Sequence, residues 1–172
     1  MKNNTKRICT LAMLIAIAFI LGTFSIRIGA GIKISFKFLA VFLASVLYGP
    51  FGGGICGALS DVLSYFLNPG FGALIPAITF VEFLYGVSFG LFFYKAKGLS
   101  KANILKVFIC IILNSVILGI FAMSYALKDL MGLSYINMVI YRIPSTALNT
   151  FFHIAGLLIL LKLLPRFEKY IQ

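Results

Sequence analysis

Long segments without a single charged residue recur along the chain, and they constrain its fold more than any other feature. They stand at residues 8–26, 38–60, 62–81, 107–127 and 143–161. A stretch of about 18 or more apolar residues is long enough to cross a bilayer as a helix. Charged residues make up only 11 % of the chain, whereas a soluble domain carries about a quarter. We therefore expect an all-α membrane protein, with residues 1–172 forming a single transmembrane domain.

Turn-forming residues divide these segments into six predicted transmembrane helices. The predicted spans cover roughly residues 7–26, 36–49, 53–67, 74–94, 102–126 and 136–164. Glycine and proline clusters such as Gly29-Ala30-Gly31, Gly49-Pro50 and Asn68-Pro69-Gly70 separate them, because these residues end helices and form turns. The second and third spans are short for a hydrocarbon core of about 30 Å. One of them is therefore expected to tilt little or to be partly re-entrant.

The distribution of Lys and Arg favours one orientation of this six-helix bundle. An even number of spans puts both termini and the loop around residues 95–101 on one side. Ten cations fall on that side, namely Lys2, Lys6, Arg7, Lys95, Lys97, Lys101, Lys106, Lys162, Arg166 and Lys169. Five fall on the other side, namely Arg27, Lys33, Lys37, Lys128 and Arg142. The positive-inside rule then predicts cytoplasmic termini. The net charge of +11 reflects this topology rather than nucleic-acid binding, which needs a solvated basic face.

The cations on the outer side need a further explanation. Arg27, Lys33 and Lys37 lie within eleven residues of one another with almost no carboxylate nearby, and Arg142 begins the last predicted span. Each of them could simply reach a lipid headgroup. As a group they favour a cationic outer mouth that receives an anionic solute, because Arg binds a carboxylate through two parallel hydrogen bonds.

Two carboxylates lie inside predicted spans. Asp61 and Glu82 are the only acidic residues between residues 38 and 94. Carboxylates in a membrane are costly, so they tend to face a cavity or a partner. One alternative is a structural pair with an Arg or Lys, and the other is hydrogen bonding to a polar ligand. Tyr65 and Tyr85 follow the two acids at helical spacing and could complete a mixed polar and aromatic pocket.

Small residues mark the first span. Ala12 and Ala16 are four residues apart, and Ala18 and Gly22 extend the run. Such spacing lets a second helix approach closely, within the chain or in a partner protein.

Several motifs of catalysis and metal binding are absent from the sequence. It contains no Walker motif, so ATP-driven work would need another subunit. No nucleophile–base pair or paired-carboxylate site is recognisable, and His153 lies in an apolar span without nearby Cys, Asp or Glu. We expect no enzymatic activity, no metal and no cofactor.

Five short motifs, by their order and spacing, resemble a known family. They are Phe24-Ser25-Ile26-Arg27, Ile34-Ser35-Phe36-Lys37-Phe38-Leu39, Tyr48-Gly49-Pro50-Phe51-Gly52, Gly57-Ala58-Leu59-Ser60-Asp61 and Pro76-Ala77-Ile78-Thr79-Phe80. This part of the chain resembles the substrate-binding S components of energy-coupling factor (ECF) vitamin transporters, and their folate branch most of all. The resemblance covers about residues 8–95. The last two spans match only in hydropathy, apart from the charged start of the sixth.

This resemblance implies a multi-pass subunit of the bacterial plasma membrane that captures a vitamin at the outer face. A separate transmembrane (T) subunit and two cytoplasmic ATPases would then drive its release. Ala12 and Ala16 would face the T subunit. Folate suits the residues described above, because its glutamate carboxylates need cations, its pterin can donate hydrogen bonds to a carboxylate, and its rings stack on aromatic side chains. The expected substrate-binding residues are Arg27, Lys33, Phe36, Lys37, Asp61, Tyr65, Phe80, Glu82, Tyr85 and Arg142.

Two alternatives stay open. The ligand of an S component could be another vitamin, a queuosine precursor or a metal, although the predicted mouth lacks the His, Cys and clustered carboxylates that a metal needs. A different class would be a membrane enzyme or a scaffold subunit without a ligand. An enzyme requires a catalytic constellation that the sequence lacks. A scaffold predicts that removing the charge of Arg27 or Lys37 changes no binding.

Overall fold

The computed structural model describes residues 2–24, 26–28, 32–67, 75–94 and 101–171, some of them at element ends by their backbone alone. In chain order the elements are α1 (Lys2–Thr23), β1 (Ile26–Ile28), β2 (Ile32–Ile34), α2 (Lys37–Leu67), α3 (Pro76–Phe93), α4 (Lys101–Leu113), the π-helix η2 (Asn114–Ala122), α5 (Met123–Met131) and α6 (Tyr135–Ile171). The prediction of a helical chain is confirmed. Among the described residues, five helices are long and apolar enough to cross a membrane.

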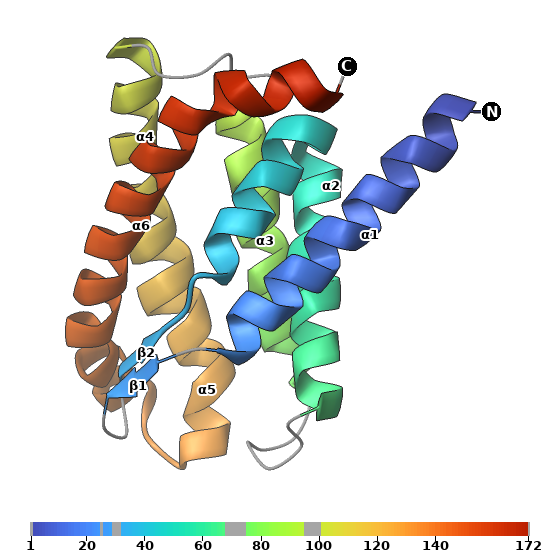
Figure 1. Cartoon of the computed structure of the whole chain (residues 1–172). Coiled ribbons are helices and arrows are strands. Elements are labelled where there is room, and N and C mark those ends of the chain that lie inside the picture. The colour runs from blue at the N-terminus through green and yellow to red at the C-terminus, as the bar shows by residue number, and fades with distance from the viewer. Residues whose placement is uncertain (1, 25, 29–31, 68–74, 95–100, 172) are drawn as a thin grey trace.

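The difference between six predicted spans and five helices lies in α2. The predicted spans 36–49 and 53–67 both belong to this one element, which is interrupted at Gly49 (φ 79°, ψ −170°). Only glycine adopts such a backbone without strain, and Pro50 follows it. In Figure 1 the chain of α2 turns back at this point, so that its two halves lie side by side. Contacts agree with this arrangement, because Gly53 of the second half packs directly against Ser45 of the first.

Glycines bring the second half of α2 and α3 into close contact. Added Cβ atoms on Gly86 and Gly90 would collide with the backbone of Gly53 and Pro50, respectively. The hydroxyl of Ser45 also donates a hydrogen bond of 2.9 Å to the Gly86 carbonyl. Small residues at the crossing allow the two helices to pack tightly, which is how helices associate in a membrane. This packing fixes the position of α3, which carries Glu82 and Tyr85.

A short β-hairpin joins α1 to α2, which the all-α prediction did not anticipate. β1 and β2 pair antiparallel, with Ile26 opposite Ile34, Arg27 opposite Lys33 and Ile28 opposite Ile32. The predicted turn at residues 29–31 lies outside the described residues. The hairpin places two of the predicted outer cations at one level of the bundle.

Figure 1 shows the start of α1 and the end of α6 at the same end of the bundle. The end of α3 and the start of α4 lie there too, whereas the β-hairpin and the turn between α5 and α6 lie at the opposite end. The first helix packs on α2 with Leu14 (8 % exposed) and Ala18 (fully buried) facing inward. Ala12 and Ala16, offset from them by two positions, are exposed.

Candidate functional site

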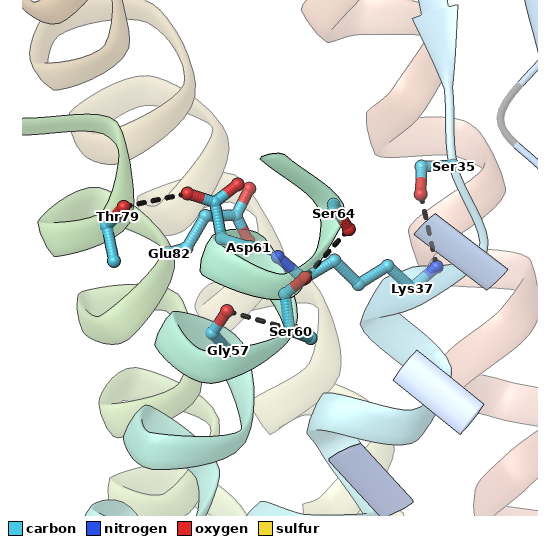
Figure 2. A network of polar contacts seen from close by, with 8 residues as sticks. All are labelled: Ser35, Lys37, Gly57, Ser60, Asp61, Ser64, Thr79 and Glu82. Atoms are coloured by element: carbon cyan, nitrogen blue, oxygen red, sulfur yellow. Dashed lines mark hydrogen bonds and ion pairs between the residues drawn. The ribbon is translucent and has the colours of Figure 1, made fainter. Parts of the chain in front are cut away.

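An ion pair links α2 to α3 inside the bundle. The Nζ atom of Lys37 lies 3.0 Å from Oε2 of Glu82, and the two side chains are only 11 % and 25 % exposed. Figure 2 shows the Lys37 side chain reaching from the start of α2 past the helical turn of Ser60 and Ser64 toward Glu82. Its Cδ atom also packs against Gly22 of α1. From the start of α2, Lys37 therefore contacts both α1 and α3. The structural pair with a cation, one of the two alternatives predicted for Glu82, is therefore present.

Asp61 is held by a different partner. The Thr79 hydroxyl of α3 donates a hydrogen bond of 2.8 Å to Oδ2 of Asp61 (Figure 2). The neighbouring hydroxyls are used locally, since Ser60 donates to the Gly57 carbonyl at 2.9 Å and Ser64 to the Ser60 carbonyl at 2.7 Å. Ser60, Asp61 and Ser64 of the second half of α2 thus lie near Lys37 and Glu82 (Figure 2), and Asp61 is joined to α3 through Thr79.

The π-helix η2 exposes a backbone carbonyl to an arginine. The N–H of Met123 donates to the carbonyls of Leu118 and Ile120 rather than to that of Gly119. The Gly119 carbonyl instead accepts a hydrogen bond of 3.0 Å from Nε of Arg142 in α6. Short π segments often occur at functional sites. Here the π-helical turn holds the Arg142 guanidinium through the hydrogen bond from Nε to the Gly119 carbonyl.

Further polar groups surround this anchor. An added Cβ on Gly119 would lie 3.0 Å from both the Tyr85 hydroxyl and Cγ2 of Thr146. The Tyr85 hydroxyl also donates to the Asn114 carbonyl, at 3.4 Å. We call Tyr85, Asn114, Gly119, Arg142 and Thr146 the π-segment cluster. Glu82 interacts electrostatically with Tyr85 and Arg142, so the cluster adjoins the Lys37–Glu82 pair.

Two buried hydroxyls have no hydrogen-bond partner within the described part of the chain. They are Oγ1 of Thr146 and Oγ of Ser124; Thr146 is 8 % exposed and Ser124 is fully buried. Buried polar groups are nearly always paired, and leaving one unpaired costs about 1–3 kcal/mol. Thr146, which belongs to the cluster, could therefore supply a hydrogen bond to a bound polar molecule.

Other predicted site residues do not join these two groups. Phe80 stacks on Phe83 with ring centroids 6.5 Å apart and is 60 % exposed; two positions from Glu82, it lies on another face of α3. The ring of Tyr65 packs edge-on against that of its neighbour Phe66 at 5.9 Å.

At the start of α2, Phe36 packs edge-on against Phe152 of α6, with ring centroids 6.5 Å apart. Arg27 and Lys33 are described by their backbone only, as opposite residues of the hairpin. Of the predicted site residues, the structure therefore brings Lys37, Tyr85 and Arg142 together around Glu82.

Sequence reasoning missed Gly119, Asn114 and Thr146. Two signals pointed to them. Asn114 is a polar residue in the charge-free segment 107–127, and Thr146 follows Arg142 by four positions on α6, which places both on one face. The ring of His153 lies 4.1 Å, centroid to centroid, from that of Phe38, the residue that follows Lys37.

Comparison with known proteins places the chain in a family. A family model described as "ECF-type riboflavin transporter, S component" matches residues 2–166. A protein named "Folate transporter FolT" from Clostridium novyi (strain NT) is 39 % identical over 82 residues, covering 48 % of this chain and 47 % of the relative. One of the same name from Streptococcus mutans serotype c (strain ATCC 700610 / UA159) is 38 % identical over 103 residues, covering 59 % and 54 %. The chain thus spans about half the length of the curated relatives it matches.

Two solved structures have the same fold over nearly their whole length. One is titled "Crystal structure of FolT bound with folic acid" and has a TM-score of 0.78 at 27 % identity, covering 91 % of this chain and 92 % of that one. The other, "Structure and mechanism of the S component of a bacterial ECF transporter", has a TM-score of 0.73 at 27 % identity, covering 98 % and 99 %. The predicted resemblance to S components is confirmed. Since the family model spans almost the entire chain, this protein belongs to the S components of ECF-type riboflavin transporters, which are substrate-binding membrane subunits and not catalysts.

Proposed function

We propose that this S component captures folate. Two relatives are named folate transporters and a structural neighbour is titled as bound to folic acid, whereas the family model is described by riboflavin. Between these two vitamins, the chemistry of the site favours folate. Folate carries two carboxylates on its glutamate moiety, and riboflavin carries none. An arginine held inside the bundle therefore has a natural counter-ion in folate and lacks one in riboflavin.

The observation that carries this proposal is how the Arg142 guanidinium is held. Its Nε is committed to the Gly119 carbonyl at 3.0 Å, which fixes the plane of the guanidinium. The remaining N–H groups belong to the two Nη atoms, and Arg binds a carboxylate bidentately through such a fork. We assign one glutamate carboxylate to this fork. Arg27 and Lys33, which face each other across the hairpin, are assigned to the second carboxylate, because like charges directly opposite are unfavourable without a counter-ion.

The Lys37–Glu82 pair has a different part in this proposal. Lys37 is already neutralised by Glu82 at 3.0 Å, so we assign it to holding α1, α2 and α3 together beside the ligand. Glu82 remains a quarter exposed and can still accept hydrogen bonds from the pterin. We assign this role to Glu82 rather than Asp61, whose carboxylate is engaged by Thr79. Tyr85 and Thr146 would bind the polar edges of the ligand, and Phe36 and Tyr65 would contact its rings.

The proposal includes a topology and partners. The turn at Gly49 within α2 lets five membrane-length helices make six passes, with both termini in the cytoplasm of a bacterial cell. This orientation is supported by the ten-to-five distribution of Lys and Arg. A T subunit and two ATPases would complete the importer. The exposed side of α1 at Ala12 and Ala16 would contact the T subunit.

A titration of radiolabelled folate against Arg142→Met in detergent tests the site. Removing a cation that pairs with a ligand carboxylate in a partly desolvated site costs about 2–5 kcal/mol, which weakens binding about 30-fold or more. Lys106→Met, which removes an exposed cation of α4, is the matched control and should bind like the unaltered protein. If a folded Arg142→Met variant kept full affinity, Arg142 would not contact the ligand.

A further inference from the structure

An apolar groove lies on the outside of the bundle, between α3 and the segment formed by η2 and α5. Its volume is about 560 Å³, and its walls include Phe80 and Leu84 of α3, Ile117 and Ala122 of η2, Tyr125 of α5 and Tyr135 of α6. Phe80, Ile117 and Tyr125 are 60 %, 55 % and 63 % exposed, so the groove opens outward. It is separate from the Lys37–Glu82 pair, since Phe80 and Leu84 lie on another face of α3 from Glu82.

The shape and chemistry of the groove suit a hydrocarbon chain. Its α3 wall runs from Ala77 to Leu84, which is about 10 Å along a helix axis. That length is most of one leaflet of a hydrocarbon core about 30 Å thick. Apart from the hydroxyls of Tyr125 and Tyr135, the lining side chains are apolar. Tyrosine is typical of the membrane–water interface, which places the mouth of the groove at headgroup level.

A cation stands at this mouth. The Nζ atom of Lys128 lies 4.4 Å from the centre of the Tyr125 ring, and Tyr125 is part of the groove wall. A cation above an aromatic face is attracted by the ring quadrupole, so Tyr125 holds the charge of Lys128 beside the groove. A molecule with an apolar chain and a negatively charged head complements both features.

We propose that the groove binds one anionic phospholipid, with an acyl chain along η2 and α3 and the headgroup phosphate on Lys128. This inference is independent of the folate proposal, because the folate site proposed above uses none of the groove residues. Phe80, which the sequence suggested as a substrate-binding residue, lines the groove instead.

The test is native mass spectrometry of the purified full chain after delipidation and titration with dioleoyl-phosphatidylglycerol or dioleoyl-phosphatidylcholine. The two lipids share their acyl chains and differ in net charge. We expect one tightly retained phosphatidylglycerol and weaker retention of phosphatidylcholine. A basic residue near the headgroups is worth about 1 kcal/mol, so Lys128→Gln should lower phosphatidylglycerol retention about fivefold. Lys106→Gln, the matched exposed cation of α4, should have no effect.

Changes in the walls test the position of the chain. Ala122→Leu narrows the groove and should reduce retention of both lipids, whereas Ala147→Leu at an exposed position of α6 outside the groove should not. If Ala122→Leu fails to fold, Tyr125→Leu provides a second test. This variant keeps an apolar wall but removes the ring that holds Lys128, so it should lower phosphatidylglycerol retention as Lys128→Gln does. Equal retention of the two lipids by the unaltered protein would overturn the proposal. The proposal would also be overturned if Lys128→Gln left phosphatidylglycerol retention unchanged, or if a folded Ala122→Leu variant retained both lipids as well as the unaltered protein does.

Discussion

Removing the Lys37–Glu82 pair one partner at a time tests how the first three helices are held together. Lys37→Met leaves the Glu82 carboxylate without the ammonium that lies 3.0 Å away. Breaking a buried pair from one side costs about 3–5 kcal/mol. Because the Glu82 side chain is 25 % exposed, we expect the lower end of that range, about 3 kcal/mol. Glu82→Gln leaves the Lys37 ammonium without its carboxylate. Because the Lys37 side chain is more deeply buried, at 11 % exposed, this variant should lose at least as much free energy of unfolding.

The double variant Lys37→Met/Glu82→Gln removes both charges. Replacing both partners of a buried pair is often close to neutral. We therefore expect the double variant to lie within about 1 kcal/mol of the unaltered protein. The coupling free energy between the two positions would then be about 5 kcal/mol, well above the value for residues that do not interact.

The assay is thermal unfolding of the purified protein in detergent, followed by gel-filtration fluorescence. For a chain of this size, about 1 kcal/mol corresponds to about 2–4 °C in Tm, so each single variant should lose about 6–12 °C. Lys106→Met controls for the loss of an exposed lysine and should shift Tm little. If the double variant lost as much Tm as the two single variants together, the ion pair would not be the source of this stability.

Three further predictions follow from the same account. Gly119→Ala should weaken folate binding about tenfold, because overpacking against Tyr85 and Thr146 costs about 1–3 kcal/mol and displaces the anchor of Arg142; a titration showing unchanged affinity would contradict this. Ala12→Trp or Ala16→Trp should abolish ATP-driven uptake while folate binding by the isolated subunit persists, and the buried Ala18→Trp should lose both; loss of binding in all three would place the Ala12 face inside the bundle. A cysteine placed at Lys97, outside the described residues, should react with an impermeant maleimide only after the cells are permeabilised; labelling of intact cells would reverse the topology.

The helices could be predicted from sequence because a membrane leaves the backbone few alternatives. A lipid-exposed segment must satisfy its own hydrogen bonds, so each long apolar run becomes a helix. The Gly49-Pro50 pair was correctly identified as the break between the second and third predicted spans, and the structure joins both spans in one element interrupted at Gly49. The strands at residues 26–28 and 32–34 were missed, since three-residue strands leave almost no periodic signal.

The site was harder to predict than the fold. Sequence reasoning selected Glu82 because carboxylates in apolar spans are costly, and it selected Lys37 and Arg142 as members of a cationic outer mouth. It kept a structural pair as one alternative for Glu82. It could not say which cation would pair, because that depends on the crossing of α2 and α3. The role of Gly119 depends on the wide π turn, which has no sequence signature of its own. The inward and outward faces of α1 likewise emerge only from its packing on α2.

The central claim is that this S component binds folate in preference to riboflavin. Equilibrium dialysis of the purified, ligand-free chain with radiolabelled folate and, separately, radiolabelled riboflavin measures this directly. We predict saturable binding of one folate per chain, displaced by unlabelled folic acid and unaffected by an excess of riboflavin. Saturable binding of riboflavin together with no measurable binding of folate would contradict the account.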